Sequence, residues 1–470
     1  MLKSPLRSLE KNKLLIRTLC LLLLALVNTA FAEEPVQEFK LDNGLKLIVK
    51  EDHRSPVVVS QVWYRAGSMD EVNGKTGVAH VLEHMMFKGT KSIEPGQFSR
   101  LIAEVGGKEN AFTGADYTCY FQQLEKSHLP LSFKLEADRM ANLVITDEEF
   151  AKEIKVVMEE RRWRTDDKPQ SRVNEQFQSM AFRAHPYGRS VIGFMNDLEN
   201  MTADDAREWY QHWYTPNNAT VVVVGDVQAE EVFALAKKYF GPLKARKLPN
   251  RKPQLEPEQM GERRAVVKAP GKLPFIIMGF HTPTLSSEVE DTENNWEPYA
   301  LDVLAGVLSG NKSARLNQRL VRETALAVSV GAGYDSATRG RLSLFELAGT
   351  PSQDKTVKEL EEALLAEIEK IKNDGVTQTE LDRVKAAVIA ADVYERDSMF
   401  YQGMQIGQLE TMGYDWRLSK TYPEKLKAVT SEQIQAVAKK YLNRDNMTVA
   451  TLDPQPIDPN AKPAGQPHIH

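Results

Sequence analysis

Cysteine is almost absent from this 470-residue chain, which contains only Cys20 and Cys119. Cys20 falls in the N-terminal leader described below, so the exported chain would keep one thiol and no internal disulfide. No hydrophobic run reaches the length that a transmembrane helix needs, which excludes a polytopic membrane protein. The composition, 42% hydrophobic, 27% charged and 8% aromatic, is that of a folded globular protein. The length suggests two or three domains.

An excess of positive charge is also lacking, since 60 Lys and Arg residues face 65 Asp and Glu residues, for a net charge of −5. Five basic residues and one acid, Glu10, lie within the first 32 positions, so the remainder carries 55 basic and 64 acidic side chains, a net −9. Nucleic-acid binding is driven by Lys and Arg contacts to phosphate. The charge therefore argues against a nucleic-acid partner.

Residues 1–32 have the three zones of a secretory signal peptide. A basic region ends at Arg17, an apolar run covers Leu19–Val27, and Ala30-Phe31-Ala32 forms a cleavage site before Glu33. The sequence predicts an exported protein, most simply periplasmic, with no stable membrane insertion after cleavage. An uncleaved N-terminal anchor is the alternative interpretation.

Strands and helices are mixed along the chain without the alternation of a doubly wound sheet, which favours an α+β fold. Four prolines and many charges between residues 241 and 262 predict an interdomain linker, after which the pattern starts again. We therefore predict two homologous domains, 33–240 and 263–452, repeated with a period near 220 residues. A polar, proline-rich stretch predicts a disordered tail over residues 453–470.

Asn43-Gly44 between alternating apolar residues predicts a hairpin at the start of the first domain. Hydrophobic periodicity predicts the other elements. The expected strands are Val57–Tyr64, Tyr117–Leu124, Ala219–Val224, Arg264–Val267 and Phe275–Phe280. The expected helices are Val78–Phe87, Phe98–Val105, Glu148–Trp163, Glu230–Tyr239, Tyr299–Leu308 and Thr379–Ala390.

The strongest chemical signal is an H-x-x-E-H motif formed by His80, Glu83 and His84. On a helix, two histidines four residues apart lie on one face, the spacing that two imidazoles need to share a metal ion. Glu83 lies beside them, within reach of a proton on a metal-bound water. The alternative is a chance match or a helix with two buried structural histidines. The apolar residues of this segment form a core stripe on the opposite side of the helix, which argues against histidines of the core. The sequence therefore predicts a zinc-hydrolase site.

A catalytic zinc usually has a third protein ligand, and the acidic helix 148–163 is the best source. Glu153 and Glu160 are seven residues apart and share a helix face, whereas Glu159 points about 120° away. Acidic runs on helices are commonly solvated faces, so the pattern alone favours that simpler interpretation.

The H-x-x-E-H motif, followed 76 residues later by Glu160, resembles the pitrilysin and mitochondrial processing peptidase family of inverted zincins. Further segments agree with this family: Gly106-Gly107-Lys108-Glu109-Asn110-Ala111-Phe112-Thr113, His185-Pro186-Tyr187-Gly188, and Trp213-Tyr214-Thr215-Pro216-Asn217-Asn218. The resemblance implies an α+β fold in which two homologous domains, each a mostly antiparallel sheet with packed helices, form half of a clamshell.

The resemblance also implies roles for individual residues. One zinc ion per chain would be held by His80, His84 and Glu160, with Glu83 as the general base and Glu153 supporting the site from behind the ligands. Asn110, Ala111 and Phe112 would lie on an edge strand to which substrate peptide adds by main-chain pairing. The bland interpretation of that stretch is an ordinary loop entering a strand.

The second domain departs from the metal motif, because Leu301, Leu304, Ala305 and Ala390 stand at the matching positions. In this family the second domain usually contributes an Arg and a Tyr that bind the substrate backbone. An ungapped alignment places Val321 and Val328 there, with Arg319, Arg322 and Tyr334 nearby. We therefore expect a dimer, more readily with a paralogous chain that supplies the Arg/Tyr pair than with a second copy.

The leading functional prediction is a zinc endopeptidase that hydrolyses peptides or unfolded segments. The alternative is a non-catalytic assembly or scaffold subunit, since fold alone does not fix function. The intact set of His80, Glu83, His84 and Glu160 favours the enzyme. A maturation peptidase with one dedicated substrate is a narrower form of the first prediction.

Overall fold

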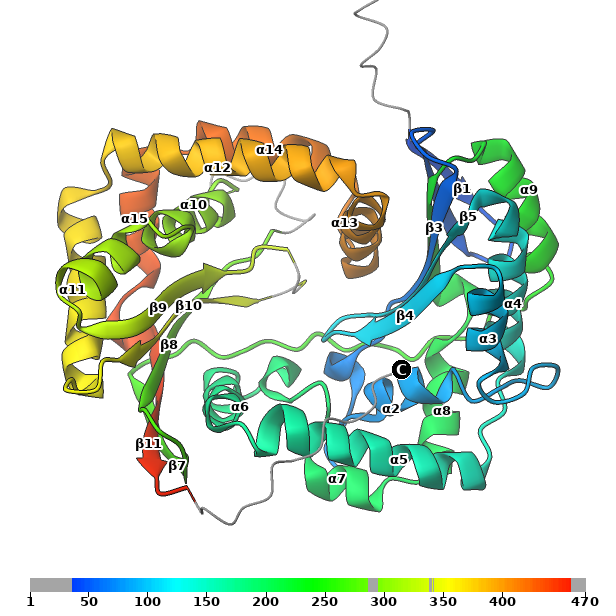
Figure 1. Ribbon diagram of the computed structural model, residues 1–470, viewed down its shortest axis with the longest axis horizontal. Helices are drawn as coiled ribbons and strands as arrows, with labels where there is room; N and C mark the ends of the chain where they lie inside the picture. Colours follow the sequence, from blue (N-terminus) through cyan, green and yellow to red (C-terminus); the bar gives the residue numbers. More distant parts are fainter. Residues whose placement is uncertain (1–35, 286–294, 338–339, 341, 458–470) are drawn as a thin grey trace, which may run out of the picture.

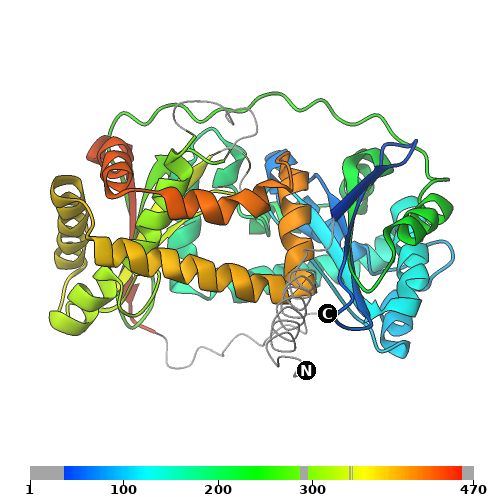
Figure 2. The same ribbon diagram turned by 90° about the horizontal axis from the view of Figure 1, so that it is seen from above.

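The computed structural model describes residues 36–285, 295–337, 340 and 342–457. It contains two halves, each built from one sheet and its helices. The stretch 241–262, which has no helix or strand, joins them. Figure 2 shows this stretch as an extended connection running along one side of the molecule. The predicted signal peptide, residues 1–32, lies outside the described residues. Among the described residues, no helix is both long and apolar enough to cross a membrane.

The N-terminal half is built around a six-stranded sheet with the order β1-β2-β6-β3-β5-β4, in which only the β2–β6 pair is parallel. Its strands are β1 (Val36–Lys40), β2 (Lys46–Glu51), β3 (Val57–Tyr64), β4 (Lys108–Thr113), β5 (Thr118–Glu125) and β6 (Ala219–Gly225). Its helices are α2 (Val78–Met85), α3 (Gln97–Glu104), α4 (Leu129–Asn142), α5 (Asp147–Arg161), α6 (Pro169–Ala181), α7 (Met195–Asn200), α8 (Ala203–Trp213) and α9 (Ala229–Tyr239).

The C-terminal half contains a five-stranded sheet with the order β7-β11-β8-β10-β9. Its strands are β7 (Arg263–Pro270), β8 (Phe275–Thr282), β9 (Ala327–Tyr334), β10 (Ser343–Pro351) and β11 (Met447–Gln455). Its helices are α10 (Glu297–Ser309), α11 (Val357–Asp374), α12 (Gln378–Asp397), α13 (Met399–Met412), α14 (Leu418–Ala428) and α15 (Ser431–Tyr441).

The two sheets have the same topology once the first strand is set aside. In each, a parallel pair formed by the first and last strands, β2–β6 or β7–β11, is followed by three antiparallel neighbours. The fold is α+β with two related domains, as the sequence predicted. Strand β11 continues to Gln455, so the first three residues of the predicted tail belong to the sheet; residues 458–470 lie outside the described residues.

Each sheet has one face covered by helices of its own half and the other face covered by a helix of the opposite half (Figure 1). Helix α13 packs on β3 and β6, where Gly407 lies so close to Trp63 that a Cβ would fall 2.1 Å from the indole Nε1. Helix α6 packs on the second sheet, where Phe177 lies against Gly279. The two halves are therefore interlocked by reciprocal helices.

Candidate metal centre

Helix α2 carries the H-x-x-E-H motif, and both of its faces are covered by other parts of the protein. Val78, Val81, Leu82 and Met85 enter the core of the first sheet. On the other side, His80 and Glu83 are buried against neighbouring elements and His84 is partly buried. The helix therefore presents its three polar side chains inside the protein, where an unpaired charge is costly.

The start of α2 is fixed by contacts that also reach α5. Both carboxylate oxygens of Glu71 accept main-chain hydrogen bonds, from Gly77 and Ala79, each at 2.9 Å. Gly77 adopts φ +88°, and a Cβ there would lie 2.6 Å from the carbonyl oxygen of Ile192. Arg161, at the end of α5, donates to the carbonyl oxygen of Gly193 at 2.6 Å. The segment around residues 192–193 thus ties the two helices together.

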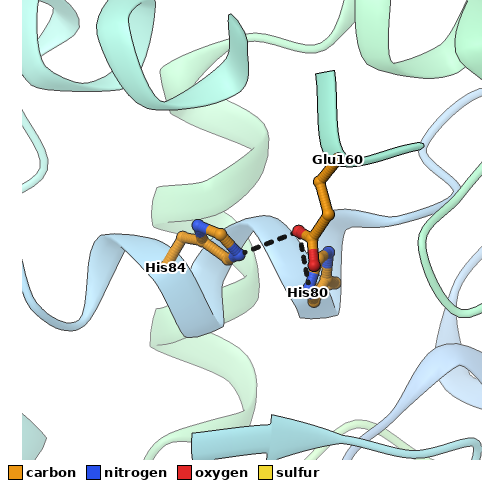
Figure 3. Close-up of side chains that lie close together, drawn as sticks. All are labelled: His80, His84 and Glu160. Atoms are coloured by element: carbon orange, nitrogen blue, oxygen red, sulfur yellow. Dashed lines mark ion pairs between the residues drawn. The ribbon is translucent and has the colours of Figure 1, made fainter. Parts of the chain in front are cut away.

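Helix α5 brings Glu160 to the two histidines (Figure 3). Its Oε2 lies 3.5 Å from His80 Nε2 and 3.4 Å from His84 Nε2. One ligand atom from each residue lies within 4.8 Å of the others. The Oε2 atom is buried and has no hydrogen-bond partner. Two imidazole nitrogens and one carboxylate oxygen are a normal ligand set for zinc, and a metal would satisfy this orphaned oxygen. The residues therefore fit the ion.

Glu153, two turns before Glu160 on α5, holds His84 in place. Its Oε1 lies 2.9 Å from His84 Nδ1, and its Oε2 lies 2.6 Å from Lys88 Nζ. A carboxylate that accepts from Nδ1 fixes the imidazole with Nε2 turned to the metal. Lys88 had no assigned role in the sequence interpretation, although it lies four residues after His84.

Glu160 has a second partner on its other oxygen. Arg164 lies in the π-helical segment η3 (Arg162–Asp166), and its Nη2 is 2.8 Å from Glu160 Oε1. This ion pair leaves Oε2 facing the histidines. The expected helix 148–163 therefore ends earlier than predicted, at Arg161, and continues as a π-helical turn that places Arg164 beside the site. Local π-helical turns are frequent at functional sites.

Glu83 is held from the edge strand of the sheet. The hydroxyl of Thr113 on β4 donates to Glu83 Oε2 at 2.5 Å. Burial raises the pKa of Glu83, while the Thr113 bond and the charge on His84 oppose that rise. A carboxylate with a raised pKa is a better proton acceptor than an exposed one.

The two histidines differ in their protonation. Burial, together with the charge of neighbouring His84, lowers the pKa of His80 to about 3, so its imidazole is neutral and available as a ligand. Burial also opposes protonation of His84, but the hydrogen bond to Glu153 and the nearby carboxylate of Glu160 outweigh it and raise the pKa to about 9. Metal binding through Nε2 of His84 therefore releases a proton.

The metal-ligand cluster lines a cavity of about 620 Å³ that extends along β4. Asn110, Ala111 and Phe112 line it, with Asn110 exposed and the other two partly buried. Strand β4 pairs with β5 on one side and lies at the edge of its sheet. The sequence-predicted ligands, Glu83, Glu153 and these three residues thus surround one space.

Two family models match consecutive parts of the chain. The model for Insulinase (Peptidase family M16) matches residues 46–194, and the model for Peptidase M16 inactive domain matches residues 200–388. The chain belongs to peptidase family M16. This finding confirms the family resemblance that the sequence motifs indicated.

Several M16 relatives resemble the chain over most of its length. It is 36% identical to the zinc protease PqqE of Helicobacter pylori over 351 residues, which cover 73% of this chain and 76% of that protein. It is 30% identical to an uncharacterized zinc protease of Mycobacterium leprae over 410 residues, covering 86% and 88% of the two chains.

Solved structures of two bacterial proteases share the fold. A protease from Helicobacter pylori gives a TM-score of 0.84 at 31% identity and covers 90% of this chain and 100% of that one. The first half of the periplasmic protease PqqL from Escherichia coli gives a TM-score of 0.74 at 21% identity, covering 89% and 92%.

The second M16 domain has different residues where the first has its ligands. Leu301 and Leu304 on α10 are buried in its core, Ala305 is partly buried, and Ala390 lies on α12. These side chains offer no metal-ligand atoms. Within the described part of the chain, His80, His84 and Glu160 are the one group of three potential ligands found close enough together to hold an ion.

The segment expected to hold an Arg and a Tyr has neither at the aligned positions. Val321 lies in the π-helical segment η7 (Asn317–Glu323) and packs against the core, while Val328 on β9 is 57% exposed. Of the nearby candidates, Arg319 pairs with a carboxylate on α11, Tyr334 donates its hydroxyl to a main-chain oxygen, and Arg322 is exposed.

Proposed function

We propose that this M16 protein is a zinc-dependent endopeptidase that hydrolyses peptides or unfolded polypeptide segments. The observation that carries the proposal is the convergence of His80 Nε2, His84 Nε2 and the orphaned Glu160 Oε2 beside Glu83. The same four side chains line a cavity large enough for several peptide residues. Relatives named zinc proteases support the assignment.

The chemistry follows from the positions of the side chains. His80, His84 and Glu160 would hold one zinc ion per chain, which would supply a Lewis acid able to lower the pKa of a bound water to about 7 and to polarise a carbonyl oxygen. Glu83 would accept the proton of the attacking water and return it to the leaving amine. Thr113 restrains one oxygen of this carboxylate at 2.5 Å, which limits the orientations that the side chain can take.

Strand β4 is the proposed docking edge for the substrate backbone. Its outer edge has no strand paired to it among the described residues, and Asn110, Ala111 and Phe112 lie at the cavity. An extended peptide added there would satisfy the free main-chain groups, as in other strand-addition complexes. Its carbonyl groups would pass close to Glu83 because Thr113 belongs to the same strand.

We further propose that the active form is a dimer with a paralogous chain, with a homodimer as the second possibility. This proposal rests on the ungapped alignment, which places Val321 and Val328 where the family resemblance implies an Arg and a Tyr. A partner would supply that pair across the cavity. The predicted signal peptide supports export to the periplasm as the place of action.

Glu83→Gln provides the central test. Because Gln keeps the shape of Glu but does not accept a proton, the variant should bind one zinc per chain and cleave no peptide. Glu159→Gln, an exposed position on α5, is the matched control and should keep full activity. Retained hydrolysis in Glu83→Gln would refute the assignment of the base.

The same assay distinguishes the alternative. Zinc content and peptide cleavage are measured for residues 33–470 alone and with a paralogous M16 chain from the same genome. One zinc with cleavage only after addition of the second chain supports the two-chain peptidase. One zinc with full activity alone removes the need for a partner. Absence of zinc binding would favour the scaffold function instead.

A further inference from the structure

Strand β4 presents two rows of side chains to different surroundings. Ala111 packs against the core that contains α2, whereas Phe112 packs against the opposite core beside Trp63. Alternation along a strand then places Glu109 and Thr113 in the row of Ala111. Thr113 is bonded to Glu83, so Glu109 faces the same side of the sheet as the proposed base.

Glu109 lines the same cavity as the metal-ligand cluster. The cavity wall also contains the apolar or small residues Phe87, Ile102, Ala103 and Gly107, together with Ser99. The side chain of Glu109 is partly buried, and its Oε2 is shielded from solvent without a hydrogen-bond partner. Burial raises the pKa of this carboxyl group, while a hydrogen bond with Ser99 and the charge on Arg139 oppose the rise. An acceptor left unpaired in this way is costly unless a ligand supplies a donor.

Arg139 is the cation whose charge acts on Glu109, and it is bonded to another carboxylate. It is 1% exposed, its Nε and Nη2 donate to Glu136 at 2.8 and 2.5 Å, and its buried Nη1 has no hydrogen-bond partner. One guanidinium thus acts on two carboxylates, Glu136 and Glu109. Glu109 itself forms no ion pair within the described part of the chain.

The other charges at the cavity are balanced. Glu153 is paired with Lys88, and Glu160 with Arg164, which is the one Lys or Arg along the cavity wall. Glu160 would also face zinc, and Glu83 would lie beside it. Glu109 is therefore the carboxylate of this cavity wall that has no ion pair of its own and no place in the proposed metal site.

We propose that Glu109 forms the acidic wall of a side-chain subsite that selects Lys or Arg in the substrate, an inference that rests on the proposed peptidase function. The aliphatic stem of such a residue would lie along Phe87 and Ile102, with its charge at Glu109. Glu109 is four residues from Thr113, or roughly 13 Å along the strand. The selected residue is therefore within about four positions of the scissile bond, on the side that runs toward Lys108.

The test uses N-acetylated decapeptides in which a single Lys or norleucine occupies each position within four residues of the cleaved bond. Acetylation removes the terminal amine, so a preference reports a side chain. We expect one position at which Lys raises kcat/KM by about tenfold or more over norleucine, mainly through KM. Glu109→Gln should lower this ratio by about tenfold, and Glu109→Lys should favour Glu at that position. Glu104→Gln, an exposed change on α3, should leave the ratio unchanged.

Binding to the Glu83→Gln background gives a readout independent of turnover. There, calorimetry should show tighter binding of the Lys peptide than of the norleucine peptide, and Glu109→Gln should abolish that difference. Cleavage with no basic preference, a preference unchanged by Glu109→Gln, or a preference limited to peptides with a free terminal amine would overturn the subsite and leave the peptidase intact. Failure of the wild-type protein to cleave any peptide, both alone and with the paralogous chain present, would instead remove the proposed function.

Discussion

Glu153→Gln probes how the residues behind the ligands contribute to metal binding. In the native protein, Glu153 accepts from His84 Nδ1 at 2.9 Å and from Lys88 Nζ at 2.6 Å, and only 3% of its surface is exposed. The glutamine keeps the size of the side chain but removes the negative charge. It can still accept from His84, but its amide then turns toward the ammonium of Lys88.

The expected loss follows from these two contacts. A hydrogen bond to a charged group contributes about 1.5–3 kcal/mol, and loss of the carboxylate weakens the bond that orients His84. Replacement of such an orienting group typically lowers metal affinity by about 10–100-fold. That range corresponds to about 1.4–2.7 kcal/mol of zinc-binding free energy.

Zinc affinity is measured by competition with a fluorescent chelator at pH 7.5, and thermal unfolding reports whether the fold is kept. The control is Glu159→Gln, which makes the same change on the same helix at an exposed surface pair with Arg162. Replacing Lys88 by Met in addition should restore part of the affinity lost in Glu153→Gln, because the unpaired ammonium is then gone. Equal zinc affinity in Glu153→Gln and the wild type would refute the proposed role, as would an equal loss in the control.

Two further predictions concern the fold around the site and in the second domain. Gly77→Ala should lower the free energy of unfolding by more than ~2 kcal/mol and reduce zinc content, because the added Cβ would meet the carbonyl oxygen of Ile192. The control is Gly74→Ala, where φ is a similar +91° but no atom lies near the added Cβ; it should lower the free energy of unfolding by only about 1 kcal/mol. The second prediction concerns Glu380 in the second domain. Burial opposes ionisation of this carboxyl group, but its bonds to Arg315 lower its pKa to about 2 from a usual 4.5. The ionised pair therefore stabilises the fold above about pH 4.5, and this stabilisation is lost as the pH falls toward 2. Denaturant unfolding of Glu380→Gln should show a loss of about 2 kcal/mol at pH 7 that shrinks over this acidic range; a loss independent of pH would contradict the ion-pair explanation.

Much of the fold follows from local sequence patterns. Strand β3 has the predicted bounds, because six of its eight residues are β-branched or aromatic and seven are buried. Among the residues that the structure describes, eight helices were not predicted: α4, α6, α7, α8, α11, α13, α14 and α15. Helices α6 and α13 show one reason. The face that each buries belongs to the sheet of the other half, and Gly403 and Gly407 weaken the helical signal of α13 while permitting its close approach to β3. Such a helix is stabilised by contacts that no local window contains.

The candidate site divides in the same way. The spacing of His80 and His84 is local and predicts a shared metal face directly. Glu160 is 76 residues away, and its selection over a solvated acidic face depended on the family resemblance. The partners Thr113 and Arg164 were missed because their roles depend on sheet register and on a π-helical turn. Arg164 had a weak signal, since a basic residue four positions after a glutamate often pairs with it.

The reciprocal helices have a consequence for how this chain can be divided. Without α13, the first sheet would expose the apolar face formed by Ile48, Val59 and Trp63; without α6, the second would expose Ile277 and its neighbours. A polypeptide cut within residues 241–262 would therefore remain a tightly associated pair of fragments. Either fragment produced alone would expose a large apolar face and would be prone to aggregate. Although the two sheets share one topology, the two halves therefore form a single unit of folding.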